Sequence, residues 1–377
     1  MRTNPAKWIS ATLLAVATLL PIGTYASPAS PKAPPRRAAS AWDIEAREYL
    51  GTPESEAAVN RGLAYLATHQ EADGHWASGG YRGDVSITAF ALLAYLASGH
   101  QPGRGKYGLV LNEAVDFLAN QVQMSGQVGT PGLVYNSAGQ SGPAMYGHGF
   151  AVLALAEVYG MSHRKDLKPK IEAAIKLIED CQNQDGIPGR DGGWRYRPVQ
   201  GEADISVTVV QVLALRSARN AGLNVPQSTI DRAIAYMRRC SNPNDGGFLY
   251  QVRQGGSGPA RTGAGVLSLM MAGLRDSPEC QGGLKYLKNH PLDRANEWPY
   301  REHFYYALYY VTQAMYQAGG DYWHTWYTQI RDHLVRTQGA NGEWGWDGYS
   351  EAGVPYATAM SVLVLQVPAG LLPIYQK

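Results

Sequence analysis

The sequence predicts an all-α protein, an α/α toroid of about six helical-hairpin repeats with an inner ring of apolar helices inside an outer ring. Three observations support this. One order of segments returns about every 45 to 60 residues, as in chains built from structural repeats. The first helix of each copy is amphipathic, whereas the second is apolar nearly all round. Finally, 45% of the 377 residues are hydrophobic, enough for a large core.

The first helices are expected to form the outer ring and to begin near residues 57, 112, 170, 229, 281 and 327. In the first of them, Val59, Leu63 and Leu66 share one face, while Asn60 and Arg61 lie elsewhere. A helix with one apolar stripe packs that stripe inward and leaves its polar face in water.

The second helices are expected to form the inner ring. Ile87–Leu96 carries no charge, and Val207–Leu215 and Ala357–Leu365 are similarly apolar. Three further copies are expected to start near Tyr146, Gly263 and His303. A helix without a polar face must be covered on all sides, and an outer ring provides that cover.

The first 26 residues read as a signal peptide. Arg2 and Lys7 are positive, Trp8–Ile22 is mostly apolar, and Ala26 is a small residue at a cleavage position. We expect cleavage and export to the periplasm or the extracellular space, with no membrane span afterwards; an uncleaved anchor is the alternative. Residues 27–45 read as a Pro/Ala/Ser-rich linker, and residues 46–377 as the toroid.

Charge and cysteine content bear on nucleic-acid binding and on disulfide bonds. The formal net charge is +2, with no long basic run after the N-terminus, so we expect no nucleic-acid partner. Cys181, Cys240 and Cys280 are too few for a disulfide framework. In an exported protein Cys181 and Cys240 could pair; buried free thiols are the alternative. Nothing in the sequence indicates the oligomeric state.

One recurring motif links the chain to a known superfamily. A basic residue and Gly (Arg61-Gly62) precede an aromatic, Gln70 and then Gly74-x-Trp76. This order resembles the QW motif of squalene cyclases, and the chain over about residues 50–370 resembles the terpenoid-cyclase/protein-prenyltransferase superfamily with its prenyltransferase and squalene oxidase repeats. The resemblance implies an α/α toroid and a structural role, tying repeats together, for these residues: Gln70, Trp76, Gln182, Trp194, Gln338 and Trp344.

Glu202-x-Asp204 is the sharpest catalytic candidate. It resembles the Asp-x-Asp-Asp motif of class II terpenoid cyclases, in which the middle acid protonates the substrate. The resemblance implies Asp204 as proton donor and Glu202 as the first acid, but Ile205 replaces the third acid. Asp84 stands at the same place in the first repeat, so the alternative is that both Asp residues cap helix N-termini.

Zinc chemistry of the prenyltransferase type is not expected. That family places an Asp and a Cys before one inner helix and a His in a later one. Here the stretch ending at His303 has no Cys, and Ala357 stands where the later His would be. We therefore expect no metal and no cofactor.

Residues at the starts of inner helices are expected to face one mouth of the central cavity, where helix dipoles favour anions. The expected pocket-lining residues are Asp84, Tyr146, His148, Arg261, His303, Tyr305, Tyr306 and Tyr356. Aromatics also crowd residues 298–327. They could stabilise carbocations, stack on sugars or simply pack.

Three functions remain open from the sequence. The chain could bind, or act on, an apolar isoprenoid-type ligand; as an enzyme it would be a class II cyclase-like isomerase or lyase. It could be a non-catalytic envelope module for a small molecule or a protein. It could also be an exported carbohydrate-active toroid, although no pair of carboxylates suited to glycoside cleavage stands out.

Overall fold

The computed structural model describes residues 50–78, 80–81, 83–125, 130–137, 143–291, 303–345 and 352–376. Contacts divide the chain into two units, Met1–Ala38 and Ala39–Lys377, and every described residue belongs to the second. The expected signal peptide (1–26) and linker (27–45) therefore lie outside the described residues.

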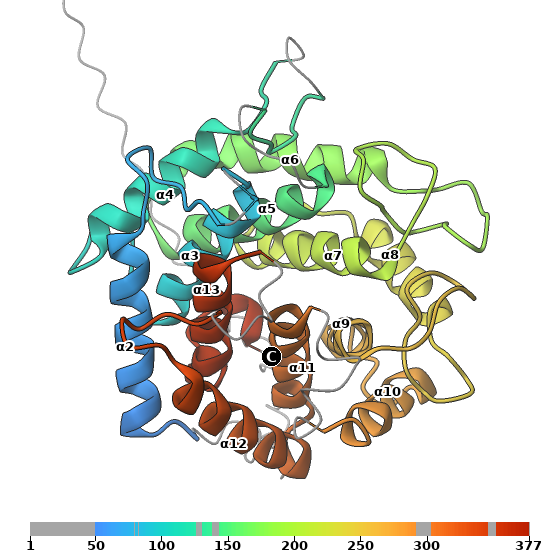
Figure 1. Cartoon of the computed structure of the whole chain (residues 1–377). Coiled ribbons are helices and arrows are strands. Elements are labelled where there is room, and N and C mark those ends of the chain that lie inside the picture. Colours follow the sequence, from blue (N-terminus) through green and yellow to red (C-terminus); the bar gives the residue numbers. More distant parts are fainter. Residues whose placement is uncertain are drawn as a thin grey trace, which may run out of the picture. The chain divides into compact units, whose positions relative to one another are not determined.

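Twelve α-helices in the described part of the chain alternate between two rings (Figure 1). The outer helices are α2 (Pro53–Thr68), α4 (Gly108–Asn120), α6 (Lys168–Cys181), α8 (Gln227–Arg239), α10 (Pro278–Lys288) and α12 (Gly320–Thr337). The inner helices are α3 (Val85–Ala97), α5 (Ala144–Met161), α7 (Ile205–Asn220), α9 (Pro259–Met271), α11 (Phe304–Ala318) and α13 (Val354–Gln366). The predicted all-α fold of six hairpins is confirmed.

The inner ring closes on itself. Each inner helix contacts the next, and α13 returns to contact α3, while α12 also contacts α2 in the outer ring. The inner helices are covered on all sides, as their composition requires; in α3 all residues except Ser86 are buried. Outer helices bury one stripe only, for example Ala58, Leu63 and Leu66 in α2.

Most helices begin within about four residues of the expected positions, which is the usual uncertainty for helix boundaries predicted from sequence. The exception is α12, which begins at Gly320 instead of near residue 327. Gly319 and Gly320 both have positive φ, 72° and 51°, so the chain reverses directly from α11 into α12. This left-handed conformation suits glycine, and it makes a longer connection unnecessary.

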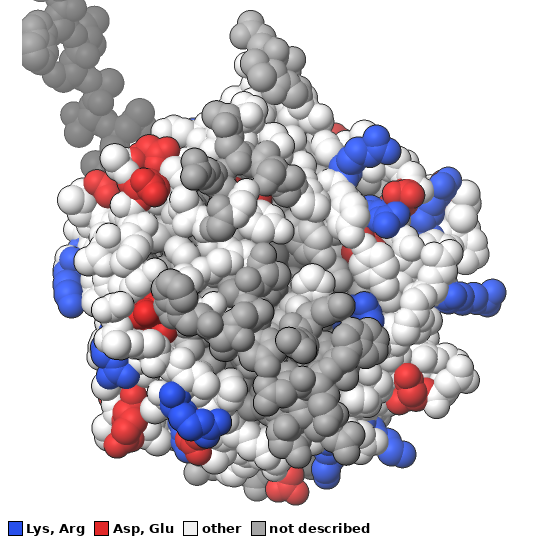
Figure 2. All heavy atoms as spheres, viewed as in Figure 1, with Lys and Arg blue, Asp and Glu red and all other residues white. Residues whose placement is uncertain are grey.

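Among the described residues, charged side chains of both signs lie mainly around the periphery of the face shown in Figure 2. Among the described residues, no helix is both long enough and apolar enough to span a bilayer.

Candidate functional site

The central cavity opens beside the N-terminal ends of the inner helices and has a volume of about 660 Å³. Eight of its lining side chains are aromatic, and Arg195, Arg261 and His303 add basic groups. The lining residues are Tyr81, Asp84, Ser86, Ile87, Phe90, Pro143, Tyr146, Phe150, Arg195, Tyr196, Ser206, Tyr250, Ala260, Arg261, His303, Tyr306, Ala352 and Tyr356.

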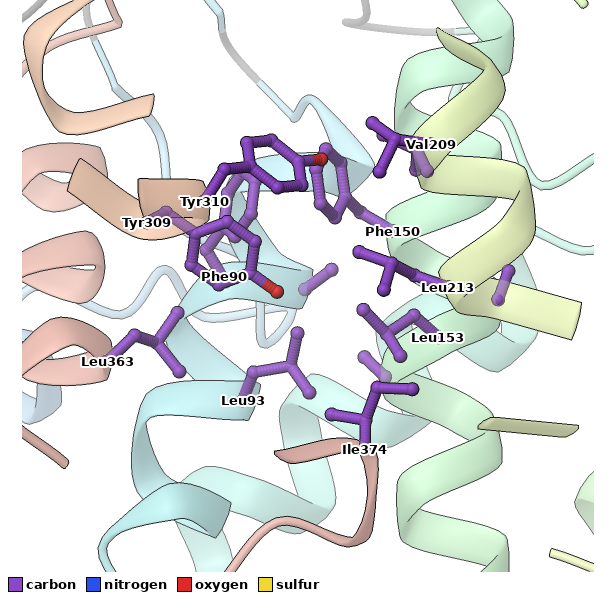
Figure 3. Packing of buried hydrophobic residues seen from close by; sticks show 14 of the residues in the cluster. Phe90, Leu93, Phe150, Leu153, Val209, Leu213, Tyr309, Tyr310, Leu363 and Ile374 are labelled. Carbon is purple, nitrogen blue, oxygen red and sulfur yellow. The ribbon is translucent and has the colours of Figure 1, made fainter. Parts of the chain in front are cut away.

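Below the cavity lies an apolar cluster in the middle of the ring. Figure 3 shows Phe90, Phe150, Tyr309 and Tyr310 gathered above Leu93, Leu153 and other aliphatic side chains from facing inner helices. The Phe90 and Phe150 ring centroids are 4.3 Å apart, and both rings also meet Tyr309 edge-on. These contacts make the floor of the cavity apolar and rigid.

The segment after α13 is part of this cluster. Its short 3₁₀ helix η5 (Pro373–Tyr375) contacts α7, and Ile374 points into the cluster in Figure 3. Gln317 of α11 donates a hydrogen bond to the carbonyl of Tyr375 at 3.0 Å. Ile374 and Tyr375 are both buried.

Asp204 and Asp84 are both N-caps, as the alternative interpretation of the sequence expected. Asp204 Oδ1 accepts a hydrogen bond from the Val207 amide at 2.8 Å, and Asp84 Oδ1 accepts one from the Ser86 amide at 2.9 Å. The Asp204 side chain is 0% exposed and is not among the residues that line the cavity. Burial raises its pKa to about 6.

Glu202 lies at the surface beside the cavity. Its side chain is 67% exposed, and its carboxylate pairs with Arg195 Nη1 at 2.8 Å. The structure thus separates the two acids of the motif: Glu202 is in solvent, while Asp204 is behind the cavity wall. Ile205, which stands where the third acid would be, is buried.

Arg195, Tyr196 and Tyr250 form a polar part of the cavity wall. The hydroxyl groups of Tyr196 and Tyr250 are hydrogen-bonded to each other, and Tyr250 donates to Asp204 Oδ2 at 3.3 Å. The Arg195 guanidinium lies over the Tyr196 ring, 5.1 Å from its centroid, and its Nε is 3.6 Å from Asp204 Oδ2.

Sequence reasoning missed these three residues because they precede inner helices in loops. A signal was available: Tyr196 and Tyr250 each stand two residues after the aromatic residue of a repeat, Trp194 and Phe248 respectively. The loops hold them with backbone hydrogen bonds, from the Met145 amide to the Tyr196 carbonyl and from the Ile205 amide to the Tyr250 carbonyl.

Six expected pocket residues line the cavity: Asp84, Tyr146, Arg261, His303, Tyr306 and Tyr356. Two do not. His148 is fully buried, and its Nδ1 accepts a hydrogen bond from the Val134 amide at 3.1 Å. Burial lowers its pKa to about 4, so it is neutral near pH 7. It lies half a turn from Tyr146 and therefore faces away from the cavity.

Tyr305 is also turned away. It is buried and meets Phe304 edge-on, with ring centroids 5.2 Å apart. One residue along a helix rotates a side chain by about 100°, so Tyr306 and Tyr305 cannot face the same side.

The repeated Gln and Trp residues join neighbouring parts of the toroid. Gln70 Nε2 donates to the carbonyls of Gly74 and Val110, Gln182 Nε2 to those of Gly192 and Thr229, and Gln338 Nε2 to those of Gly342 and Ala58. Each Gln thereby fastens its own turn to the first turns of the next outer helix. Trp76, Trp194 and Trp344 are buried, and each indole N–H donates at 2.8 Å to a carbonyl of the preceding outer helix.

The three cysteines are free and buried, so the pairing of Cys181 with Cys240 that export would have allowed is absent. In the described part of the chain, no three His, Cys, Asp or Glu side chains gather in a way that could hold a metal ion.

No family model and no curated protein matches the sequence. Solved structures do resemble the fold. A cellobiose 2-epimerase from Bacillus thermoamylovorans has a TM-score of 0.61 at 13% identity, covering 83% of this chain and 98% of the epimerase. An inactive α-1,6-mannanase variant from Salegentibacter sp., in complex with α-1,6-mannotriose, has a TM-score of 0.59 at 8% identity, covering 84% and 99%.

The type II terpene cyclase MstE from Scytonema has a TM-score of 0.53 at 15% identity, covering 85% of this chain and 99% of the cyclase. These similarities show the α/α toroid fold that the repeats predicted. Because the similar proteins perform unrelated reactions, the fold does not select a function.

Proposed function

We propose that the chain binds an isoprenoid-type ligand in its central cavity, with the apolar part of the ligand on the floor and a polar or anionic end at the mouth. The single observation that carries the proposal is this polarity gradient. Phe90 and Phe150 lie at the bottom of the lining, and Arg195 and Arg261 lie beside the helix N-termini.

The size and lining of the cavity suit a small molecule. Ligand sites commonly have volumes of about 300 to 1,000 Å³, with mostly apolar walls and a few polar groups. This cavity has a volume of about 660 Å³. Removing apolar ligand surface from water contributes about 25 cal/mol per Å², so the aromatic floor favours a hydrocarbon chain or ring.

Arg261 is the best-placed cation for an anionic end. Its Nη2 donates to the Gly256 carbonyl at 2.9 Å, which fixes the side chain, whereas its buried Nε has no hydrogen-bond partner among the described residues. Arg261 lines the cavity, so its guanidinium offers an anionic end a charged hydrogen-bond donor; the buried Nε itself becomes accessible only if the side chain turns.

The geometry favours binding over protonation by Asp204. A class II cyclase needs its acid to face the ligand, but Asp204 caps α7 behind the wall. We also propose that the protein is exported, as the first 26 residues suggest; N-terminal sequencing of the secreted protein would test this.

A direct experiment extracts the purified mature protein with organic solvent and identifies co-purified lipids by mass spectrometry. Calorimetric titration with farnesol and farnesyl phosphate follows. We expect both to bind, with farnesyl phosphate about tenfold tighter because a charged hydrogen bond contributes about 1.5 to 3 kcal/mol. In R261Q this advantage should largely vanish.

Two phenylalanines provide a matched pair for the apolar part. F150L alters the cavity floor, whereas F117L alters a buried ring of α4 that stacks on His75 outside the cavity. Farnesol affinity should fall severalfold in F150L only. Absence of co-purified lipid together with absence of farnesol and farnesyl phosphate binding would refute the proposal.

A second candidate is a carbohydrate ligand. Tyrosine rings surround the mouth, among them Tyr81, Tyr146, Tyr196 and Tyr250, and phenols both stack on sugar rings and hydrogen-bond to them. The similar mannanase structure holds α-1,6-mannotriose. Binding of this trisaccharide in the same calorimeter, without binding of farnesol, would favour the carbohydrate function.

A further inference from the structure

We propose that Tyr196 is a general base in the central cavity, activated by a hydrogen-bond relay that runs through Tyr250 to the carboxylate of Asp204. This inference goes beyond ligand binding, because it assigns a proton-transfer site to one wall of the cavity. It rests on the proposed function only in requiring that a ligand enters there.

The direction of the hydrogen bonds makes Tyr196 an acceptor toward the cavity. Tyr250 gives its only hydroxyl proton to Asp204 Oδ2. Either hydroxyl group can donate in the bond between them; with the Tyr250 proton on Asp204, this bond takes its proton from Tyr196. The free lone pairs of the Tyr196 oxygen are then available to a hydroxyl group on a bound ligand.

Asp84 provides an internal comparison from another repeat. Asp84 caps α3 as Asp204 caps α7, and it also accepts a hydrogen bond from the Ser86 hydroxyl at 2.7 Å. Among the described residues, the hydrogen bonds of its carboxylate go to Ser86 and not to a tyrosine, although its backbone amide donates to the Tyr81 carbonyl. Capping alone therefore does not require the Asp204–Tyr250–Tyr196 chain, which connects segments of two repeats.

Arg195 supports the same chemistry. Its guanidinium lies over the Tyr196 ring and close to Asp204 Oδ2. A cation in this place stabilises negative charge on a phenol that is losing its proton; it also keeps the Asp204 carboxylate ionised, which lowers the affinity of that carboxylate for a proton. Burial raises the pKa of Asp204 to about 6, so this carboxylate is ionised at pH 8 and is still basic enough to take up a proton.

The proposed step moves three protons. An alcohol of the ligand gives its proton to the Tyr196 oxygen, Tyr196 gives its own proton to Tyr250, and Tyr250 gives its proton to Asp204 Oδ2. The shift is partial: three O–H bonds lengthen while three begin to form, which moves negative charge from Asp204 to the ligand oxygen and makes that oxygen more nucleophilic without releasing a free alkoxide. The ligand class for this site is thus an alcohol. The hydroxyl group could belong to a polyprenol or to a sugar, and the calorimetric titrations with farnesol and with α-1,6-mannotriose distinguish these two.

The relay can be tested without knowing the natural ligand. A small arylsulfonyl fluoride reacts with activated tyrosine: the phenol oxygen bonds to sulfur, fluoride leaves, and the phenolic proton passes along the relay. We expect peptide mapping by mass spectrometry to place the label on Tyr196, ahead of Tyr146 and Tyr306 in the same cavity.

Conservative variants separate the relay from the fold. D204N keeps an oxygen that caps α7, since Asn is as good an N-cap as Asp, but replaces the relay acceptor. Y250F removes the middle hydroxyl. Labelling of Tyr196 should slow about 10²-fold in each, the usual scale of a general base. D245N, which alters a turn outside the cavity, should label like the unmodified protein.

The pH profile adds a readout that a structural role would not change. Asp204 is faced by Arg195 and Tyr250 from loops, Tyr236 from α8, Cys240 at the C-terminal end of α8, and Tyr146 from α5. In the unmodified protein, the rate of Tyr196 labelling should rise with pH and show an inflection near pH 6 as Asp204 ionises. In D204N the rate should lose this inflection.

Two results would overturn the inference: equal labelling of the cavity tyrosines, or an unchanged Tyr196 rate and pH profile in a D204N protein whose circular dichroism and thermal midpoint are normal. Neither depends on isoprenoid binding. A protein that failed to bind farnesol but labelled at Tyr196 would refute the proposed ligand and leave the relay intact.

Discussion

Replacing Glu157 by Gln should make the stability of the protein less dependent on pH. Glu157 lies in α5 and is buried, and its Oε1 accepts a hydrogen bond from the Ser217 hydroxyl at 2.6 Å. Its Oε2 has no hydrogen-bond partner among the described residues, although the nearby Ile374 amide favours the ionised form slightly. Burial dominates and raises the pKa from 4.5 to about 7.

The sign and size of the effect follow from this shift. A raised folded-state pKa means that the stabilising contribution is complete below pH 4.5 and is lost as the pH rises to about 7. Moving the pKa from 4.5 to about 7 corresponds to roughly 3 kcal/mol in total, most of which falls between pH 5 and pH 8. Gln stays neutral throughout, so E157Q should gain roughly 2 to 3 kcal/mol relative to the unmodified protein as the pH rises from 5 to 8.

Urea unfolding, followed by tryptophan fluorescence at pH 5 and at pH 8, measures this difference. Both proteins are measured at both pH values, and the free-energy difference between them is compared. The contributions of other titrating groups, and any pH-independent cost of the buried amide, therefore cancel. If the free-energy difference between the two proteins were the same at pH 5 and pH 8, the reasoning about Glu157 would be wrong.

Three further predictions concern the repeats and are checked by thermal or urea unfolding. Q182A should lose about 2 kcal/mol, because its side chain bonds to Gly192 of its own turn and to Thr229 of α8, whereas Q184A, at an exposed position of the same turn, should change little; equal effects would contradict this role. G192A should be destabilised by more than about 1 kcal/mol, since its φ is 86° and a Cβ would lie 2.1 Å from the Arg232 carbonyl oxygen; a neutral result would show that the loop can move. D204A should be about 1 kcal/mol less stable than D204N through loss of the α7 cap, and equal stabilities would mean that the cap contributes nothing.

The fold was predictable because it repeats. Six copies of one amphipathic and one apolar helix specify two rings, and the turns at Gln182 and Gln338 are recognisable by residue type alone. The sequence also raised the correct alternative for Asp204, because its counterpart Asp84 stands at the start of another inner helix. Repetition therefore identified which residues serve the scaffold.

The cavity wall was less predictable, since it depends on directions that no single repeat specifies. His148 and Tyr305 lie near the starts of inner helices, but the helix rotation turns both away from the cavity. The relay needs Tyr250 from one repeat to reach Asp204 in the preceding one. Ile374 enters the ring from a segment outside the repeat pattern.

Closure of the ring has a consequence for synthesis of the chain. Gln338 in the last repeat bonds to Ala58 in the first, 280 residues away. At about 5 to 20 residues per second, α2 is synthesised roughly 15 to 55 s before Gln338. The helices that pack against α2 at this closure, α12 and α13, are also synthesised last. The earliest repeat on the ribosome is thus the one that stays incomplete longest, and it is where a chaperone would have most to shield.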